Sequence, residues 1–334
     1  MSPSSSPGKL LLGKVDYDSV VKKVETLKKY FLKTKSTVSG KKVTISCRLL
    51  AENLRYKAEW ITLNIRQTEW LKEGFFNGYY DNKSRRVEGR KGSLTRMILT
   101  SQVMPIMSGV ASNEQVDILL KNIKKYLYDN KLGGWRLNTD FNSEQHDLGR
   151  AFSFIYGEKE NGAFFNHMVV MFAYALYKRN HSEDAWRVIN SIFNMATDTV
   201  RSKIYPCLPE YFNSEGRGMY SYLTGSASWF ILTAVTQAFG VRGLNGDLLI
   251  EPKLSAEQFK HAASIAVNRS FAGKRIEVIF SNPKKLKAGK YGIIEATLDS
   301  YPLPVEEYNF LVISRKNILA LSAYKTHKIE IILG

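Results

Sequence analysis

The sequence of 334 residues is poor in cysteine and has no long apolar run. Its two cysteines, Cys47 and Cys207, are too few for a disulfide framework and lack the spacing of a metal site. No stretch approaches the about 18 consecutive apolar residues of a membrane helix, and the N-terminal Leu-Leu-Leu is far too short for a signal peptide. We therefore expect a cytoplasmic protein without a metal site or a membrane-spanning segment.

Several catalytic signatures are absent as well. The sequence has no GxxxxGK[ST], no GxSxG, no HExxH, and no GxGxxG after a predicted strand. These absences argue against a Walker-type nucleotide site, a nucleophile elbow, a zinc protease and a dinucleotide-binding fold. We expect no organic cofactor.

The chain is strongly basic, with a formal net charge of +17, but the excess is concentrated at its ends. Residues 1–50 carry 11 Lys and Arg against 3 Asp and Glu, and residues 251–334 carry 13 against 8. The middle, 51–250, carries 24 against 20. This distribution indicates a solvated, solubilising surface and not a nucleic-acid-binding motif. A basic chain would still attract an anionic co-substrate.

Helical periodicity dominates the first part of the chain. Val20, Val24, Leu27 and Phe31 lie three or four residues apart, which predicts a helix over 16–34. The Ser- and Pro-rich start, residues 1–15, is predicted to be disordered. Further helices are predicted at 48–66, 95–108, 114–129, 163–179, 183–200 and 220–239.

The pattern changes to short β-branched segments after Gly246. They are DLLIEP, SIAVNRS, KRIEVIFS, GIIEATL, NFLVIS and KIEIIL, separated by Gly, Pro, Asn and Lys. Such segments are typical of an antiparallel β-sandwich. We therefore predict a helical domain over 16–245 and a β domain over 246–334.

One candidate for an anion site is His167, in the first turn of the helix predicted from 163. A neutral imidazole there can donate one N–H to an anion bound at the helix start. A core or capping histidine explains the same position, and from the residues alone that interpretation is favoured.

The second candidate is the segment 204–229, where Gly, Pro and aromatic residues precede a helix. Glu210 and Tyr211 place a carboxylate beside an aromatic ring, a combination that suits sugars. Thr224 and Gly225 offer a hydroxyl and an unshielded N–H for a phosphate. An ordinary N-cap also explains one of these small residues, but it does not explain so long a Gly-rich approach to the helix.

Four segments, ENGAFFNHM, YPCLPEYFNSEGRGMY, YLTGSASW and FGVRGLNGDLLIEPKL, together resemble the family 94 glycoside phosphorylases. The group that includes β-1,2-oligoglucan phosphorylases and cyclic β-1,2-glucan synthases is the most similar. The resemblance is dense over about 144–260. It implies an (α/α)6 toroid, incomplete in this chain, followed by a jelly-roll-like β-sandwich.

The resemblance also implies inverting phosphorolysis of β-glucosides such as β-1,2-glucooligosaccharides. Phosphate attacks the anomeric carbon while an Asp protonates the leaving oxygen. By position, phosphate is held by His167 and by the pair Thr224 and Gly225, together with an upstream Arg. The neighbourhood places Glu210, Tyr211 and Arg217 at the sugar.

The chain departs from this family in one respect. The Asp-Trp-Asn-Asp motif that carries the general acid does not occur in it, and Asp16 and Asp18, nearest to the expected place, have a different context. We expect the acid upstream of this chain, which leaves open whether the chain alone is an enzyme. The alternative is a non-catalytic carbohydrate-binding remnant. The expected partners are phosphate and a β-glucan oligosaccharide, with a second copy or a complementary N-terminal chain, and neither nucleic acid nor membrane.

Overall fold

The computed structural model describes residues 19–36, 44–204, 207–222, 224–305 and 309–334. The chain divides into two compact units, residues 1–68 and 69–334. The segment 1–15, predicted to be disordered, lies outside the described residues, as do Asp16 and Asp18. The domain boundary predicted at 245–246 falls within the second unit and stays a prediction.

The described part of the first unit contains two helices, α2 (Val20–Thr34) and α3 (Cys47–Thr68), close to the predicted ranges. Ser19 caps α2, because its hydroxyl accepts a hydrogen bond from the Lys22 N–H at 3.3 Å. None of the helices in the described part of the chain has the length and hydrophobicity to cross a membrane.

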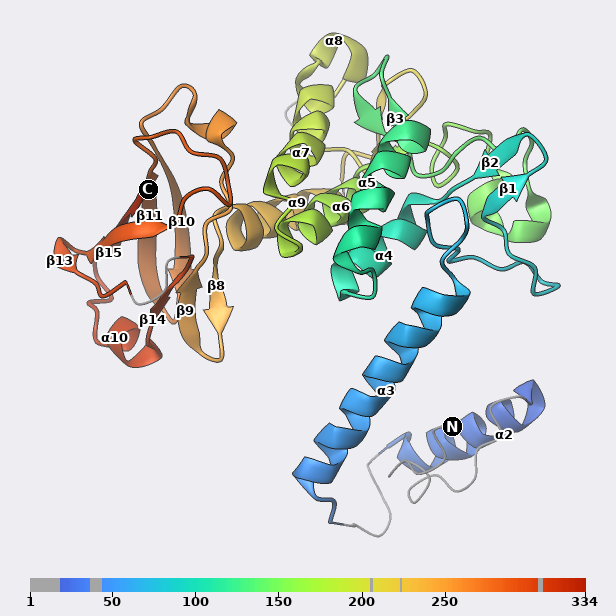
Figure 1. The fold of residues 1–334 in the computed structure, drawn as a ribbon, viewed down its shortest axis with the longest axis horizontal. Coiled ribbons are helices and arrows are strands. Elements are labelled where there is room, and N and C mark those ends of the chain that lie inside the picture. Colours follow the sequence, from blue (N-terminus) through green and yellow to red (C-terminus); the bar gives the residue numbers. More distant parts are fainter. Residues whose placement is uncertain (1–18, 37–43, 205–206, 223, 306–308) are drawn as a thin grey trace. The chain divides into compact units, whose positions relative to one another are not determined.

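The helical part of the second unit is arranged around α6 (Figure 1). Its main helices are α4 (Leu99–Ser108), α5 (Asn113–Leu127), α6 (Asn166–Lys178), α7 (Ser182–Thr197) and α9 (Gly225–Thr233), with a short α8 (Thr199–Ser202) after α7. The helix α6 packs against α4, α7 and α9. It buries side chains on several faces, including Val170, Phe172 and Leu176, as expected for a central helix.

The helices α4 and α6 begin later than the sequence predicts because short strands occupy their expected first residues, and α9 begins at 225 instead of the predicted 220. The strands β1 (Gly89–Lys91) and β2 (Leu94–Arg96) form a hairpin before α4. A three-stranded sheet, β5 (Phe164–Phe165), β6 (Tyr211–Phe212) and β7 (Gly218–Met219), precedes α6 and α9. A further hairpin joins β3 (Tyr128–Asp129) to β4 (Gly134–Trp135) after α5.

The chain turns to β structure after a π-helical turn, Ala234–Ala238, that follows α9. One sheet has the order β10-β11-β15-β12-β13 and the other the order β14-β9-β8. The strands are β8 (Val241–Leu244), β9 (Asp247–Ile250), β10 (Ser264–Phe271), β11 (Lys274–Ser281), β12 (Ile293–Leu298), β13 (Tyr301–Pro302), β14 (Leu311–Ile313) and β15 (Thr326–Leu333). A short helix, α10 (Arg315–Leu319), precedes β15.

Both sheets contribute to one hydrophobic core, with Leu248 and Ile250 from β9, Val278 from β11, and Ile329 and Ile331 from β15. The helices followed by strands agree with the predicted mixture of helix and sheet. The prediction of a wholly antiparallel sheet is wrong at one pair, since β11 and β15 run parallel. A parallel pair needs a long crossover, and here the segment from 282 to 325, which contains β12, β13, β14 and α10, provides it.

Candidate functional site

The structure brings His167 and Gly225 together from two separate segments. His167 is the second residue of α6, and Gly225 is the first residue of α9. A Cβ added to Gly225 would lie 2.8 Å from Cε1 and 3.0 Å from Nδ1 of His167. The imidazole therefore rests on the bare Cα of this glycine, and any larger residue at 225 would displace it.

The His167 ring is also held by an aromatic side chain of α9. The ring centres of His167 and Trp229 lie 5.8 Å apart, and Tyr174 contacts the same indole edge to face at 5.6 Å. The Nε2 atom of His167 is buried and has no hydrogen-bond partner among the residues that the structure describes. Since buried polar atoms in folded proteins are almost always paired, this atom is a candidate to bind a ligand.

Thr224 is the N-cap of α9. Its Oγ1 accepts from the Ser226 N–H at 3.2 Å and lies 3.0 Å from the Ser226 hydroxyl. The N-cap alternative is therefore confirmed for this residue. A cap and an anion site are compatible, because both use the oriented N–H groups and the positive end of the helix dipole.

Glu210 ties the starts of both helices together through its backbone. Its carbonyl oxygen accepts from the Asn166 N–H at 2.9 Å and from the Ser226 hydroxyl at 3.5 Å. Its own N–H donates to the carbonyl oxygens of Met219 and Tyr220. The backbone of this one residue thus links α6, α9 and the strand β7.

Tyr211 and Arg217 do not join this arrangement through their side chains. Tyr211 is only 1% exposed, stacks on Phe165, and donates its hydroxyl to Glu158 at 3.3 Å. Burial raises the pKa of this hydroxyl, and the Glu158 carboxylate raises it further. Arg217 is exposed in the turn between β6 and β7, where its N–H donates to the Asn213 Oδ1 at 3.0 Å.

An open hollow of about 550 Å³ lies beside Tyr211, and the sequence analysis did not predict it. It is lined by Phe154, Glu158, Lys159, Tyr211, Met219, Tyr220, Ser221 and Tyr222. The Lys159 ammonium lies 5.1 Å from the Phe154 ring centre and 5.2 Å from that of Tyr220. Two aromatic rings thus hold this cation in place.

Lys159 forms no ion pair among the described residues because both neighbouring carboxylates have other partners. Glu158 accepts from Tyr211 and Asn213, and Glu160 pairs with Arg150 at 2.6 Å. Lys159 also has the left-handed backbone that non-glycine residues rarely adopt, with φ of 47°. In the sequence, Glu-Lys-Glu resembles a solvated run of charges, so only the fold identifies this lysine.

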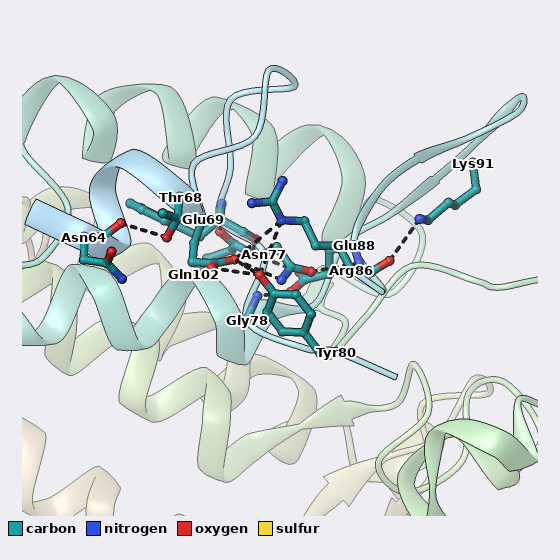
Figure 2. Close-up of polar contacts among 11 residues, drawn as sticks. Asn64, Thr68, Glu69, Asn77, Gly78, Tyr80, Arg86, Glu88, Lys91 and Gln102 are labelled. Carbon is teal, nitrogen blue, oxygen red and sulfur yellow. Dashed lines mark hydrogen bonds and ion pairs between the residues drawn. The ribbon is translucent and has the colours of Figure 1, made fainter. Parts of the chain in front are cut away.

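Figure 2 shows a second feature that the sequence analysis missed, the buried carboxyl of Glu88. It accepts from the Gly78 N–H at 2.7 Å, from the Ile98 N–H at 2.8 Å and from the Gln102 amide at 3.1 Å. Burial raises the pKa of Glu88 to about 7, although these hydrogen bonds lower it. Glu88 fixes the loops before α4 and so supports one of the helices that pack on α6.

No group of His, Cys, Asp and Glu side chains with the geometry of a metal site occurs within the described ranges. The candidate functional site is the pair of helix starts that carry His167, Thr224 and Gly225.

The family resemblance is confirmed by comparison with known proteins. Residues 48–240 match the catalytic domain of the glycosyl hydrolase 94 superfamily, and the chain belongs to this family. It is 27% identical over 243 residues to a cellobionic acid phosphorylase of Neurospora crassa. The aligned residues make up 69% of this chain and 30% of that protein.

Two further relatives have similar identities. A cyclic β-(1,2)-glucan synthase, NdvB, of Rhizobium meliloti is 24% identical over 215 residues, 61% of this chain and 8% of its own. A 3-O-β-D-glucopyranosyl-β-D-glucuronide phosphorylase of Paenibacillus borealis is 24% identical over 213 residues, 61% of this chain and 26% of its own. The chain spans less than a third of the length of these relatives.

Proposed function

We propose that the chain is the phosphate-binding part of an inverting glycoside phosphorylase that acts on β-glucosides, including β-1,2-glucooligosaccharides. The observation that carries the proposal is the contact of the His167 ring with Gly225 at the start of α9. Membership of the glycosyl hydrolase 94 superfamily and the phosphorylases among its relatives support it.

In this proposal, phosphate is bound by the His167 imidazole, the Thr224 hydroxyl and the Gly225 N–H. All three groups can donate a hydrogen bond, and the helix dipole of α9 favours an anion at the same end. A phosphate oxygen then attacks the anomeric carbon as the bond to the leaving oxygen breaks. Since phosphate is already an anion, the protein needs to place it more than to activate it.

The leaving oxygen receives its proton from an aspartic acid that we assign to the segment upstream of this chain. Such an acid stands on the opposite side of the sugar from the nucleophile in inverting enzymes. We further propose that the helices of 16–245 form part of an (α/α)6 toroid and that 246–334 is a jelly-roll-like domain. A complementary N-terminal polypeptide or a second copy would complete the cytoplasmic enzyme.

The hollow beside Tyr211 is our proposal for the sugar. Lys159 can donate to sugar hydroxyls, and the exposed rings of Tyr220 and Tyr222 offer faces for sugar C–H groups. Two relatives are named for an acid and a glucuronide, so the Lys159 cation suits acidic as well as neutral substrates. Glu210, Tyr211 and Arg217 form the edge of this region in the proposal.

A phosphate titration tests the site. We expect the wild type to bind phosphate and both His167→Ala and Thr224→Val to bind it about tenfold to hundredfold more weakly, since a hydrogen bond to a charged group contributes about 1.5–3 kcal/mol. The matched controls are His146→Ala and Thr197→Val, at exposed positions outside the site. Calorimetry or ³¹P NMR measures the affinities.

Equal affinity in the wild type and both site variants would remove the assignment. A separate assay incubates the chain with phosphate and β-1,2-glucooligosaccharides and measures glucose 1-phosphate. Product from this chain alone would show that the general acid lies within it.

A further inference from the structure

A second cavity, distinct from the candidate phosphate site, lies between α5 and α7. Its volume is about 600 Å³, and α6 contributes Phe172 and Leu176 to its lining. Its lining contains none of the candidate phosphate residues His167, Thr224 and Gly225 and none of the predicted sugar residues. This volume is within the range of about 300–1,000 Å³ that small-molecule sites occupy.

The lining combines aromatic faces with short polar side chains. Tyr128 and Trp135 pack together with ring centres 4.7 Å apart at one end of the cavity. Asn190 and Asn194, one turn apart on α7, add two side-chain amides. Aromatic faces accept the C–H faces of sugar rings, and amides exchange hydrogen bonds with hydroxyl groups.

The charged groups of the lining balance in number, with the basic side chains Lys124, Arg187 and Arg201 and the acidic side chains Asp184, Asp198 and Glu257. Arg187 pairs with Asp184 at 2.7 Å, and Arg201 lies 3.7 Å from Asp198. Glu257 accepts from the Trp186 indole at 3.0 Å. Because the lining carries as many acidic as basic side chains, the cavity suits a neutral, hydroxyl-rich ligand better than an anion.

The indole of Trp135, in the lining of this cavity, has a hydrogen-bond donor left unpaired by the described residues. Its Nε1 atom is buried and has no acceptor among the residues that the structure describes. Indole nitrogen can only donate, and buried donors are rarely left unpaired in native proteins. A sugar hydroxyl is a suitable acceptor for this donor.

We infer that the cavity between α5 and α7 is a second saccharide-binding site, which holds a neutral oligosaccharide chain away from the reacting bond. The saccharide class follows from the lining itself, whereas the choice of a β-glucan rests on the proposed function. Such a site would keep a long glucan attached while its end is processed.

The test uses the indole signals of the full chain in ¹H–¹⁵N NMR spectra. The sequence has five tryptophans, and Trp135→Phe, which keeps an aromatic ring but removes the N–H, identifies the signal of Trp135. During titration with a β-1,2-glucooligosaccharide we expect this signal to move. Trp135→Phe and Asn190→Ala should each weaken oligosaccharide binding about fivefold or more, since each removes about one hydrogen bond.

The matched control is Asn268→Ala, an exposed asparagine on β10 outside the cavity. Asn190→Ala provides a second variant should Trp135→Phe fail to fold, because Asn190 is only half-buried. A signal of Trp135 that stays fixed at saturating oligosaccharide, or unchanged affinity in both variants, would overturn the inference.

The same titration with His167→Ala separates this inference from the proposed function. Retained movement of the Trp135 signal together with lost phosphate binding would support both. Retained phosphate binding in His167→Ala would count against the phosphate site alone, whereas a fixed Trp135 signal would count against the second saccharide site alone.

Discussion

Replacing Gly225 by alanine should weaken phosphate binding even though alanine is the better helix former. Gly225 is the first residue of α9 and does not have a positive φ, so alanine can adopt its backbone conformation. In a helix interior this exchange typically stabilises by about 0.5–1 kcal/mol. The new Cβ would, however, lie 2.8 Å from Cε1 of His167.

The size of the conflict follows from this distance. Contacts between carbon atoms are favourable at about 3.5–4.0 Å, so the imidazole has to move by roughly 1 Å. Overpacking of this kind costs about 1–3 kcal/mol. We therefore expect Gly225→Ala to lower the free energy of unfolding by up to about 2 kcal/mol and to weaken phosphate binding at least about tenfold.

A double-mutant cycle with His167→Ala isolates the contact. If the imidazole causes the penalty, Gly225→Ala should destabilise the wild type but stabilise the His167→Ala variant, where the space is vacant. Urea denaturation gives the four stabilities, and ³¹P NMR gives the phosphate affinities. Additive effects of the two substitutions, or an unchanged phosphate affinity in Gly225→Ala, would refute the proposed packing of the ring on the glycine.

Two further predictions concern pH. Burial raises the pKa of Glu88 from 4.5 to about 7, so the folded state binds more protons than the unfolded state between these pH values. The free energy of unfolding should therefore fall as pH rises from 4.5 to 7. Glu88→Gln should abolish this fall in urea titrations at about pH 5 and about pH 8. Hydrogen bonds from Lys325, the Lys328 N–H and His327 outweigh desolvation and lower the pKa of Asp299 from 3.8 to about 2. The stabilisation by this carboxylate should therefore be present above pH 3.8 and disappear as pH falls to 2. Asp299→Asn should destabilise the protein at about pH 6 but not at about pH 2, and an equal effect at both would contradict this origin.

The positions of the helices could be predicted from the sequence because their apolar spacing is local information. The exact starts of α6 and α9 could not, since they depend on β5, β6 and β7, strands of two residues that pair across long sequence distances. The parallel pairing of β11 with β15 was missed for a related reason. Strands alternate their side chains with a period of two in either orientation, so the pattern does not reveal direction.

The roles of the individual site residues could be predicted from the sequence only in part. Thr224 and Gly225 before an apolar run indicate a helix start from local rules, and the structure has the cap at Thr224. The packing of His167 on Gly225 depends on the contact of α6 with α9, which periodicity does not specify. Lys159 was missed because its importance depends on where its neighbouring carboxylates are directed.

The arrangement explains why the approach to α9 is rich in glycine and short of regular structure. In the proposed site two helix starts converge on one anion, which requires the backbone between them to come close. The Glu210 carbonyl brings them together by accepting from both Asn166 and Ser226. Gly225 then allows the imidazole to lie directly on the helix start. Each feature alone is an ordinary cap or turn. Their combination leaves the buried Nε2 of His167 without a partner among the described residues, on a ring that packs against the first residue of α9, and in our proposal a bound phosphate is that partner.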